Sequence, residues 1–211
     1  NCVTAEQLAA RGFDCRPYDT RHTGANNYGR IGGLRVIRGL TLGLLGIGEV
    51  AREVVPLVRA FGLEVCYHSR QRLAPAAEAA LGVRYCDYEA LFAQSDIVSL
   101  HVPLSAATRG LVGARALAAL KPGAWLVNTS RAGLVDHDAL VAALASGRLG
   151  ALAADVHYEE PVGAGEQLLA FDNVLATPHI AGGPRQTLFA DIEEIAHNIQ
   201  QALVTQGKSS R

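Results

Sequence analysis

Residues 40–51 read LTLGLLGIGEVA, and this stretch decides the fold. Its first half is an apolar run of β type, and its second half opens a helical pattern after a glycine-rich turn. Within the turn, Gly46, Gly48 and Ala51 have the GxGxxA spacing of a dinucleotide-binding motif. The spacing alone is a weak signal, and a purely structural tight turn is the alternative. The strand before it and the helix after it favour a phosphate-binding turn.

Each position of this motif has a distinct expected role. Gly46 permits the turn, Gly48 lets a pyrophosphate approach the backbone, and Ala51 keeps the helix close to the sheet. The helix then begins at Glu49 and Val50. Its first turn offers free N–H groups and a partial positive charge to the phosphates.

Outward from this stretch, short apolar β-type runs alternate with helical patterns. Strands are predicted at 41–46, 64–68, 82–85, 97–102, 124–130, 151–156 and 173–179, and helices at 49–61, 87–93 and 137–147. The last of these helices has Asp136 as its N-cap and ends at Gly147. The alternation implies βαβ crossovers. The sequence therefore predicts an α/β fold, a Rossmann-type doubly wound parallel sheet covered on both faces.

Composition excludes several classes of function. Among 211 residues, 18% are charged and the net charge is −1, so no global field favours nucleic acid or an anionic membrane. No apolar run reaches the ~18 residues of a membrane span, and no signal peptide is seen. The four cysteines have neither CxxC nor zinc spacing, as expected for reduced thiols of a cytoplasmic protein.

Three functional side chains follow predicted strands. Arg131 comes directly after 124–130, Glu160 follows 151–156 by a few residues, and His179 ends 173–179. Singly, each has an ordinary structural explanation: a surface cation, an acid before a proline, a loop histidine. Ligands of open α/β sheets bind beyond the carboxyl ends of the strands, so the three together beside a dinucleotide turn indicate an active site. The run HYEE at 157–160 has no second His or Cys at ligand spacing, so no metal is predicted.

The sequence resembles the D-isomer-specific 2-hydroxyacid dehydrogenases over about residues 38–200. The resemblance is carried by GLTLGLLGIGEVA, SDIVSLHVPLSAATRGLV, KPGAWLVNTSRAGLVDHDAL, ADVHYEEP and NVLATPHIAGG. The sequence departs from the family pattern at Ala51 and Ala132, where family members commonly have glycine, and neither difference removes a functional group. The resemblance implies that Arg131, Glu160 and His179 are catalytic and that Asp155 holds the nicotinamide amide. Further implied cofactor contacts are Val102, Pro103, Thr108, Thr129 and Ser130.

These residue types suit the reduction of a small 2-oxo acid. A histidine can donate the proton to the carbonyl oxygen, and a neighbouring carboxylate favours its imidazolium form. An arginine can hold the substrate's carboxylate or carbonyl oxygen through a two-pronged contact. The nicotinamide supplies the hydride, so no metal is needed. The alternative function is a nucleotide-sensing, corepressor-like binding protein of the same fold.

The resemblance also implies a domain organisation. Members of the family have a second, substrate-binding domain, most of which we expect to be absent from this chain. Residues 1–38 are then an arm or interdomain linker, 39–184 the NAD(P)-binding domain, and 185–211 a C-terminal helix returning toward the substrate domain. An apolar stripe on that helix comprises Leu188, Ile192, Ile195, Ile199 and Leu203. The family commonly dimerises through the cofactor domain, so a homodimer is expected.

The stretch GLEVCYHSRQR at 62–72 bears on the choice of cofactor. An acidic residue that binds the ribose hydroxyls of NAD is expected about 20 residues after the first motif glycine. Here the strand ends in His68, Ser69 and Arg70 instead. A hydroxyl and a guanidinium, with Arg72 as a second candidate, suit the 2′-phosphate that an aspartate would repel. We predict NADP(H) over NAD(H); a solvated basic turn with a dual preference is the alternative.

Overall fold

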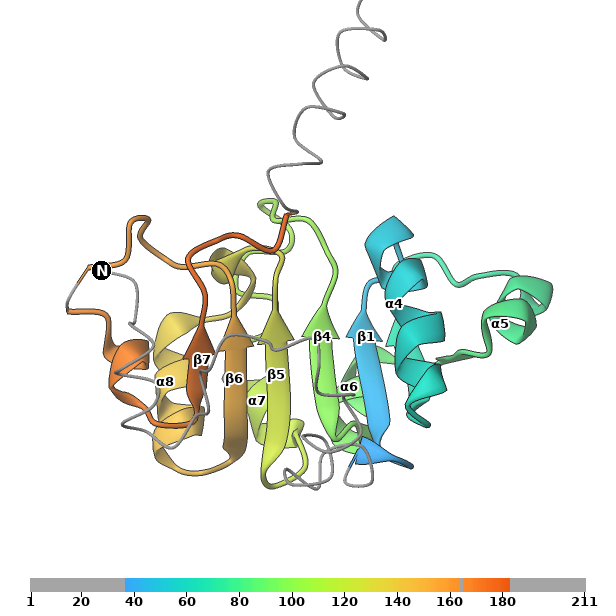
Figure 1. Cartoon of the computed structure of the whole chain (residues 1–211), viewed down its shortest axis with the longest axis horizontal. Coiled ribbons are helices and arrows are strands. Elements are labelled where there is room, and N and C mark those ends of the chain that lie inside the picture. Colours follow the sequence, from blue (N-terminus) through green and yellow to red (C-terminus); the bar gives the residue numbers. More distant parts are fainter. Residues whose placement is uncertain (1–36, 164, 183–211) are drawn as a thin grey trace, which may run out of the picture. The chain divides into compact units, whose positions relative to one another are not determined.

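The computed structural model describes residues 37–163 and 165–182. In these residues, seven parallel strands form one sheet in the order β3-β2-β1-β4-β5-β6-β7 (Figure 1). The strands are β1 (Thr41–Leu45), β2 (Glu64–His68), β3 (Arg84–Tyr85), β4 (Ile97–Leu100), β5 (Ala124–Asn128), β6 (Leu149–Ala154) and β7 (Val174–Ala176). The order reverses between β1 and β4, the place where doubly wound sheets bind ligands. The predicted fold class is confirmed.

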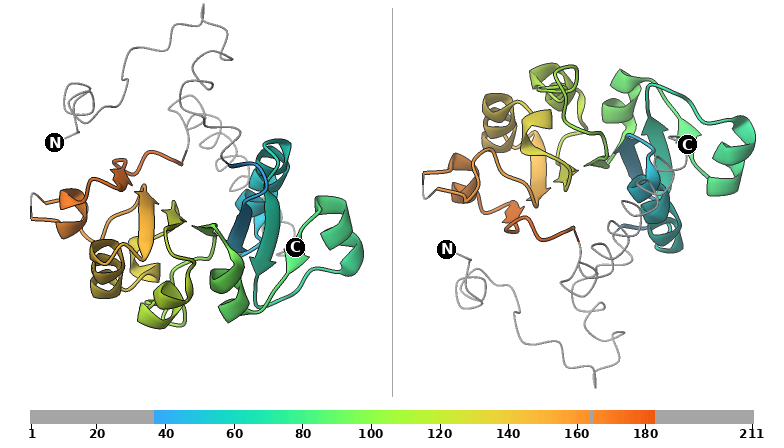
Figure 2. Two further views of the ribbon diagram at one scale, coloured as in Figure 1. Left: turned by 90° about the horizontal axis from the view of Figure 1, so that it is seen from below. Right: turned by 90° about the horizontal axis from the view of Figure 1, so that it is seen from above.

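Helices cover both faces of the sheet. Figure 2 shows α4 on one face and α6, α7 and α8 on the other. The helices are α4 (Glu49–Ala60), α5 (Pro75–Leu81), α6 (Tyr88–Gln94), α7 (Ala114–Ala119) and α8 (His137–Ala145), with 3-10 helices η1 (Ala132–Leu134) and η2 (Gln167–Ala170). The predictions of α4, α6 and α8 are confirmed. Neither α5 nor α7 was predicted, because seven and six alanine-rich residues are too few to display a helical period.

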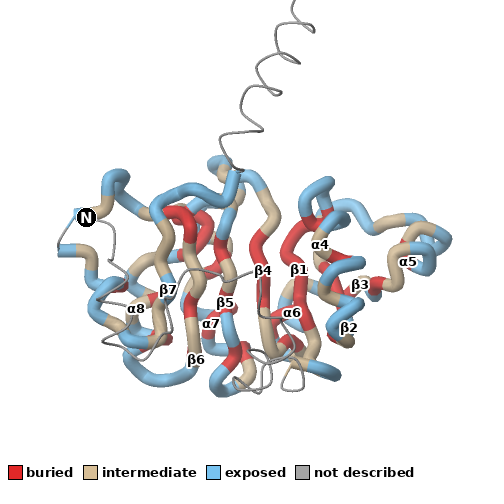
Figure 3. Tube along the Cα trace, viewed as in Figure 1, coloured by how far each residue is buried: buried red, intermediate tan, exposed pale blue. Residues whose placement is uncertain are grey.

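The core consists of two apolar clusters, one on each face of the sheet. One joins the central strands to α6, α7 and α8, and it includes the fully buried Phe92 and Leu126. The other joins β1 and β2 to α4, and it includes Tyr67 and Ala51, both also fully buried. Burial is greatest in the strands at the centre of the sheet (Figure 3). Each fully buried large apolar side chain, such as Phe92 or Leu126, stabilises the fold by roughly 1.5–3 kcal/mol.

Local signals position two of the helices as the sequence indicated. Asp136 begins α8 by accepting a hydrogen bond from the Ala139 N–H at 2.9 Å. Gly147 follows the helix with a φ of +71°, a conformation that favours glycine. Ala51, at the last position of the GxGxxA motif, is fully buried against the sheet. Its small side chain therefore lets α4 lie close to β1.

The chain divides between Pro178 and His179 into two compact units. The predicted arm lies outside the described residues except for Ile37 and Arg38, and the predicted helix 185–211 with its apolar stripe lies wholly outside them. No helix within 37–163 or 165–182 is long and apolar enough to cross a membrane.

Candidate active site

Gly46 occupies a position that no other residue fits. Its φ is +100°, and a Cβ there would lie 2.5 Å from the carbonyl oxygen of His101. Its N–H donates to the carbonyl of His68 at 2.8 Å. The ends of β1, β2 and β4 thus meet at this glycine, which is the tight turn that the motif predicts.

Gly48 differs from Gly46, because the protein's own packing does not require a glycine there. Its φ is −73°, and an added Cβ would meet no protein atom within 4 Å. Gly48 is also the N-cap of α4, and no side chain caps the first turn of that helix. The glycine therefore leaves open space in front of backbone N–H groups that have no helical partners. This arrangement fits a dinucleotide pyrophosphate.

A cavity of about 650 Å³ opens at this turn. It is bounded by three segments that follow β1, β4 and β5, and its volume is typical of small-molecule sites. The lining residues are Gly48, Glu49, Val50, Ala51, His101, Val102, Pro103, Leu104, Thr129, Ser130 and Arg131. The structure thus brings the phosphate turn, the predicted 102–103 segment and the 129–131 segment together around one space. His101 and Leu104 are additions to the predicted set.

Asn128 holds the loop that bears Arg131. Its side chain is buried, its Oδ1 accepts from the Ser130 N–H at 3.0 Å, and its Nδ2 donates to the Arg131 carbonyl at 3.0 Å. The Ser130 hydroxyl donates to the Leu100 carbonyl at 2.7 Å, which ties this loop to β4. Arg131 is exposed at the cavity, and its guanidinium donates one hydrogen bond to the Ser130 carbonyl at 2.6 Å. Sequence reasoning did not assign a role to Asn128; an amide at the end of an apolar strand was the available signal.

Thr108 and His101 shape the second segment of the cavity. The Thr108 hydroxyl donates to the Pro103 carbonyl and accepts from the Ser105 N–H, both at 2.7 Å. Thr108 does not line the cavity, so in this structure it supports the segment rather than forming its wall. His101 Nε2 lies 2.9 Å from the Ser99 hydroxyl, and burial lowers the pKa of His101. Its ring is therefore neutral at neutral pH and adds no charge to the cavity.

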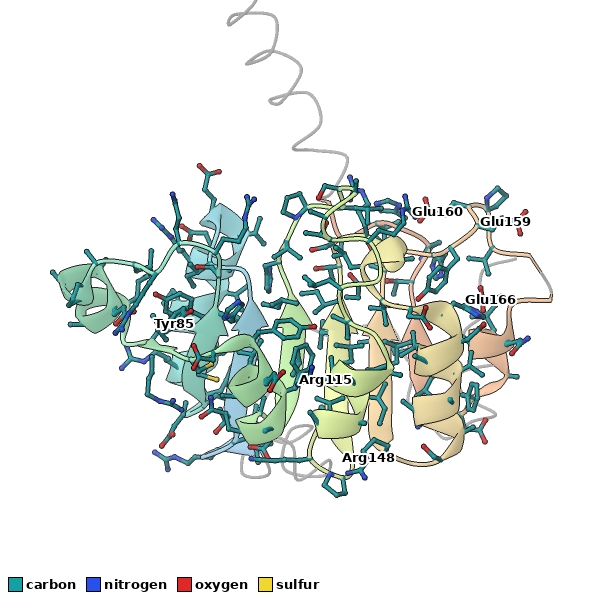
Figure 4. The ribbon with its side chains drawn as sticks, turned by 180° about the vertical axis from the view of Figure 1, so that it is seen from behind. Tyr85, Arg115, Arg148, Glu159, Glu160 and Glu166 are labelled. Carbon is teal, nitrogen blue, oxygen red and sulfur yellow. The ribbon has the colours of Figure 1, made fainter. Side chains whose placement is uncertain are left out.

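The exits of β6 and β7 carry the predicted nicotinamide contact, Asp155, and the two remaining predicted catalytic residues, Glu160 and His179. Asp155 is buried, and its Oδ1 accepts from the Thr177 hydroxyl at 2.5 Å. Glu160 lies at the edge of the sheet where the strands end (Figure 4), and its Oε1 accepts from the His157 N–H at 3.0 Å. His179 begins the second unit, three residues after β7, with a φ of +55° that is uncommon outside glycine.

The exit of β2 shows how the predicted cofactor-selecting residues are arranged. The His68 ring lies 3.0 Å from the Cys86 carbonyl, and its centroid is 5.8 Å from the Tyr85 ring and 5.7 Å from the Tyr88 ring. The Ser69 hydroxyl donates to the Gln71 carbonyl. His68 is therefore packed toward β3 and α6.

The two arginines of this turn, Arg70 and Arg72, differ in whether another side chain already binds the guanidinium. Arg72 makes two hydrogen bonds to the Glu78 carboxylate, at 2.8 and 2.9 Å, and lies over the Tyr85 ring. The hydrogen bonds from Arg72 and Tyr67 lower the pKa of Glu78 to about 2. Arg70 is exposed and makes no hydrogen bond or ion pair with another described residue. Arg70 is thus the guanidinium free to meet a ligand, and Arg72 is held by the fold.

No three His, Cys, Asp or Glu side chains gather into a metal site within the described part of the chain. Comparison with known proteins gives the family. Residues 10–181 match the family model described as the D-isomer specific 2-hydroxyacid dehydrogenase, NAD binding domain. The chain belongs to the D-isomer specific 2-hydroxyacid dehydrogenase family. The predicted family and its cofactor domain are confirmed.

Individual members of this dehydrogenase family are similar over much of the chain. A glyoxylate reductase of Aeropyrum pernix is 44% identical over 151 residues, which are 72% of this chain and 45% of the relative. A hydroxypyruvate reductase of Thermotoga maritima is 40% identical over 144 residues, which are 67% of this chain and 46% of the relative. The crystal structure of a glyoxylate reductase from Paecilomyes thermophila has a TM-score of 0.73 and 35% identity, covering 84% of this chain and 55% of that one. The chain thus spans about half the length of these dehydrogenases.

Proposed function

We propose that the intact protein is an NAD(P)H-dependent reductase of small 2-oxo acids such as glyoxylate or hydroxypyruvate. The observation that carries the proposal is the shared cavity, because Gly48 of the phosphate turn and Arg131 line the same space. A dinucleotide on the turn and an acid on the guanidinium would then be neighbours. Relatives named glyoxylate and hydroxypyruvate reductases support this choice of substrate class.

In the proposed reaction, each catalytic side chain has one task. Arg131 is exposed at the cavity, and its permanent charge suits it to hold the substrate's carboxylate or carbonyl oxygen. His179 donates a proton to the carbonyl oxygen, and the carboxylate of Glu160 favours the protonated imidazole. The uncapped first turn of α4 and the 102–103 and 129–131 segments would hold the cofactor, with Asp155 at the nicotinamide amide. When bound, the nicotinamide supplies the hydride.

The proposed pairing of Glu160 with His179 predicts a change in pH dependence. In Glu160→Gln, the protonated histidine loses its anionic neighbour, so the rate of reduction should fall at a lower pH than in the unmodified enzyme. The measurement is kcat/KM for reduction across the pH range. Glu159→Gln is the matched control, since it removes the same charge one residue away and should leave the profile in place. Identical profiles for Glu160→Gln and the unmodified enzyme would argue against the pairing.

We also propose that NADPH is preferred over NADH, through Arg70. The support is its exposure and its lack of a partner among the described residues, while Glu78 already holds Arg72. Arg70→Ala should weaken NADPH binding by roughly ten- to a hundredfold, since a charge-assisted hydrogen bond is worth about 1.5–3 kcal/mol. NADH binding should barely change, because NADH lacks the 2′-phosphate. Titration of both cofactors by nicotinamide fluorescence measures this.

Arg115→Ala is the control for that titration. Arg115 is an exposed cation on α7 that pairs with Glu89 of α6, so its loss changes the net charge equally and removes no residue of the β2 exit. Tighter binding of NADH than of NADPH by the unmodified protein would overturn the proposed preference. The homodimer and the cytoplasmic location stay predictions.

A further inference from the structure

Thr177 joins the exits of β6 and β7 through all of its polar groups. Its N–H donates to the Ala154 carbonyl at 2.9 Å, and its hydroxyl donates to Asp155 Oδ1 at 2.5 Å. Its carbonyl lies 2.8 Å from Nε2 of His157. A carbonyl oxygen only accepts, so this contact requires the His157 tautomer or cation with a proton on Nε2. Thr177 is therefore fixed to the segment that leads from β6 to Glu160.

His157 makes a second contact that connects it to the proposed chemistry. Its backbone N–H donates to Glu160 Oε1 at 3.0 Å. One residue thus contacts the carboxylate proposed to favour the imidazolium and, through its ring, the carbonyl of Thr177. His179 follows Thr177 by two residues, with a left-handed φ of +55°. A histidine in such a conformation depends on the surrounding chain to hold its direction.

From these contacts we propose that His157 is a positioning residue that holds the Glu160 carboxylate and the exit of β7, from which the chain runs on to His179. It acts on the carboxylate through its backbone N–H and on the β7 exit through the bond of its ring to the Thr177 carbonyl. This inference rests on the proposed reductase function, and it assigns a role to a side chain that sequence analysis considered only as part of the HYEE run. The ring is engaged with a backbone carbonyl, so its task is mechanical and requires no proton transfer.

The same loop has a second anchor, which provides a matched comparison. The Tyr158 hydroxyl donates to the Val135 carbonyl at 2.9 Å, and its ring packs edge-on against His137 at a centroid distance of 4.8 Å. This anchor ties the loop to the segment before α8 and does not involve Thr177. The other titratable groups around the loop are Asp155 after β6, Glu159 and Glu160 in the loop itself, Asp136, His137 and Asp138 at the start of α8, and Glu166 before η2. None of them is altered in the variants below.

The test compares His157→Phe, His157→Gln and Tyr158→Phe in the intact enzyme. His157→Phe keeps the backbone N–H but removes the ring's bond to Thr177, so kcat should fall by roughly ten- to a hundredfold, the scale of a small misplacement of a catalytic group. The high-pH decline in reduction should also move to lower pH, as the carboxylate no longer favours the imidazolium fully. His157→Gln can donate an amide N–H to the same carbonyl, and it should recover most of kcat and the original pH profile. NADPH affinity should be unchanged in all three.

Tyr158→Phe distinguishes positioning from simple anchoring of the loop. It should keep a kcat within about twofold and an unshifted pH profile, even where its thermal stability falls by the amount expected for one lost hydrogen bond. The proposal is overturned if His157→Phe retains normal kcat and pH profile, if the glutamine variant fails to recover activity while folded, or if Tyr158→Phe behaves like His157→Phe. Failure of the reductase function itself would appear separately, as no turnover by the unmodified enzyme.

Discussion

Replacing His179 with alanine in the intact enzyme is expected to lower the turnover of glyoxylate or hydroxypyruvate by about two to four orders of magnitude. That loss is typical of removing a general acid, because water must then protonate the carbonyl oxygen. NADPH affinity should remain close to normal, since His179 is absent from the cavity lining at the phosphate turn. Steady-state oxidation of NADPH measures the first quantity, and a fluorescence titration measures the second.

His137→Ala provides the control for that result. His137 is also a histidine with carboxylate neighbours, and hydrogen bonds that its ring donates to Glu166 and Asp138 raise its pKa. It lies at the start of α8, away from the cavity, so its loss should affect stability more than turnover. Normal turnover by His179→Ala would contradict the proposed mechanism. An unmodified intact protein that binds NADPH tightly but reduces no 2-oxo acid would instead favour the nucleotide-sensing alternative.

The fold could be predicted from the sequence because its signals are local. A buried parallel strand is a short apolar run, and each predicted run corresponds to a strand in the sheet. The GxGxxA turn likewise depends on residues next to one another, and Gly46 has the positive φ that the motif requires. Where no local period existed, as in α5 and α7, prediction failed. Those helices are held by packing against neighbouring helices, α5 against α4 and α7 against α6 and α8, which six or seven residues alone do not reveal.

The sequence predicted which residues meet at the site, but not how their polar atoms are bonded. From the sequence alone, Arg131, Val102 and Gly48 could be placed at one edge of the sheet, because parallel strands end together. In the structure all three line the same cavity. It could not reveal which polar atoms are already engaged. Arg72 faces Glu78, and the ring of His157 faces Thr177, twenty residues away. Such pairings follow from the register of neighbouring strands and the path of loops, which no local pattern encodes.

The phosphate turn allows a prediction in which stability and binding change in different ways. Gly48→Asp places a preferred N-cap residue at the start of α4, so the melting temperature should stay the same or rise slightly. A Cβ added at Gly48 would meet no protein atom within 4 Å, so the substitution introduces no steric clash there. The new carboxylate would accept the free N–H groups of the first turn and repel a pyrophosphate. Dinucleotide affinity should therefore fall by roughly a hundredfold, the loss of one or two charge-assisted hydrogen bonds.

Gly113→Asp is the matched control, because it makes the same substitution at a helix start that does not line the cavity. Gly113 caps α7 with φ −96° and ψ −170°, in the same extended region as Gly48, and no side chain caps that helix either. An added Cβ there would lie in ordinary contact, 3.6 Å from the Gly110 carbonyl oxygen, and Gly113 does not line the cavity. Gly113→Asp should therefore match Gly48→Asp in melting temperature while binding NADPH normally. Equal weakening in both variants would indicate a general effect of charge, and undiminished binding by Gly48→Asp would mean that the pyrophosphate does not use this turn.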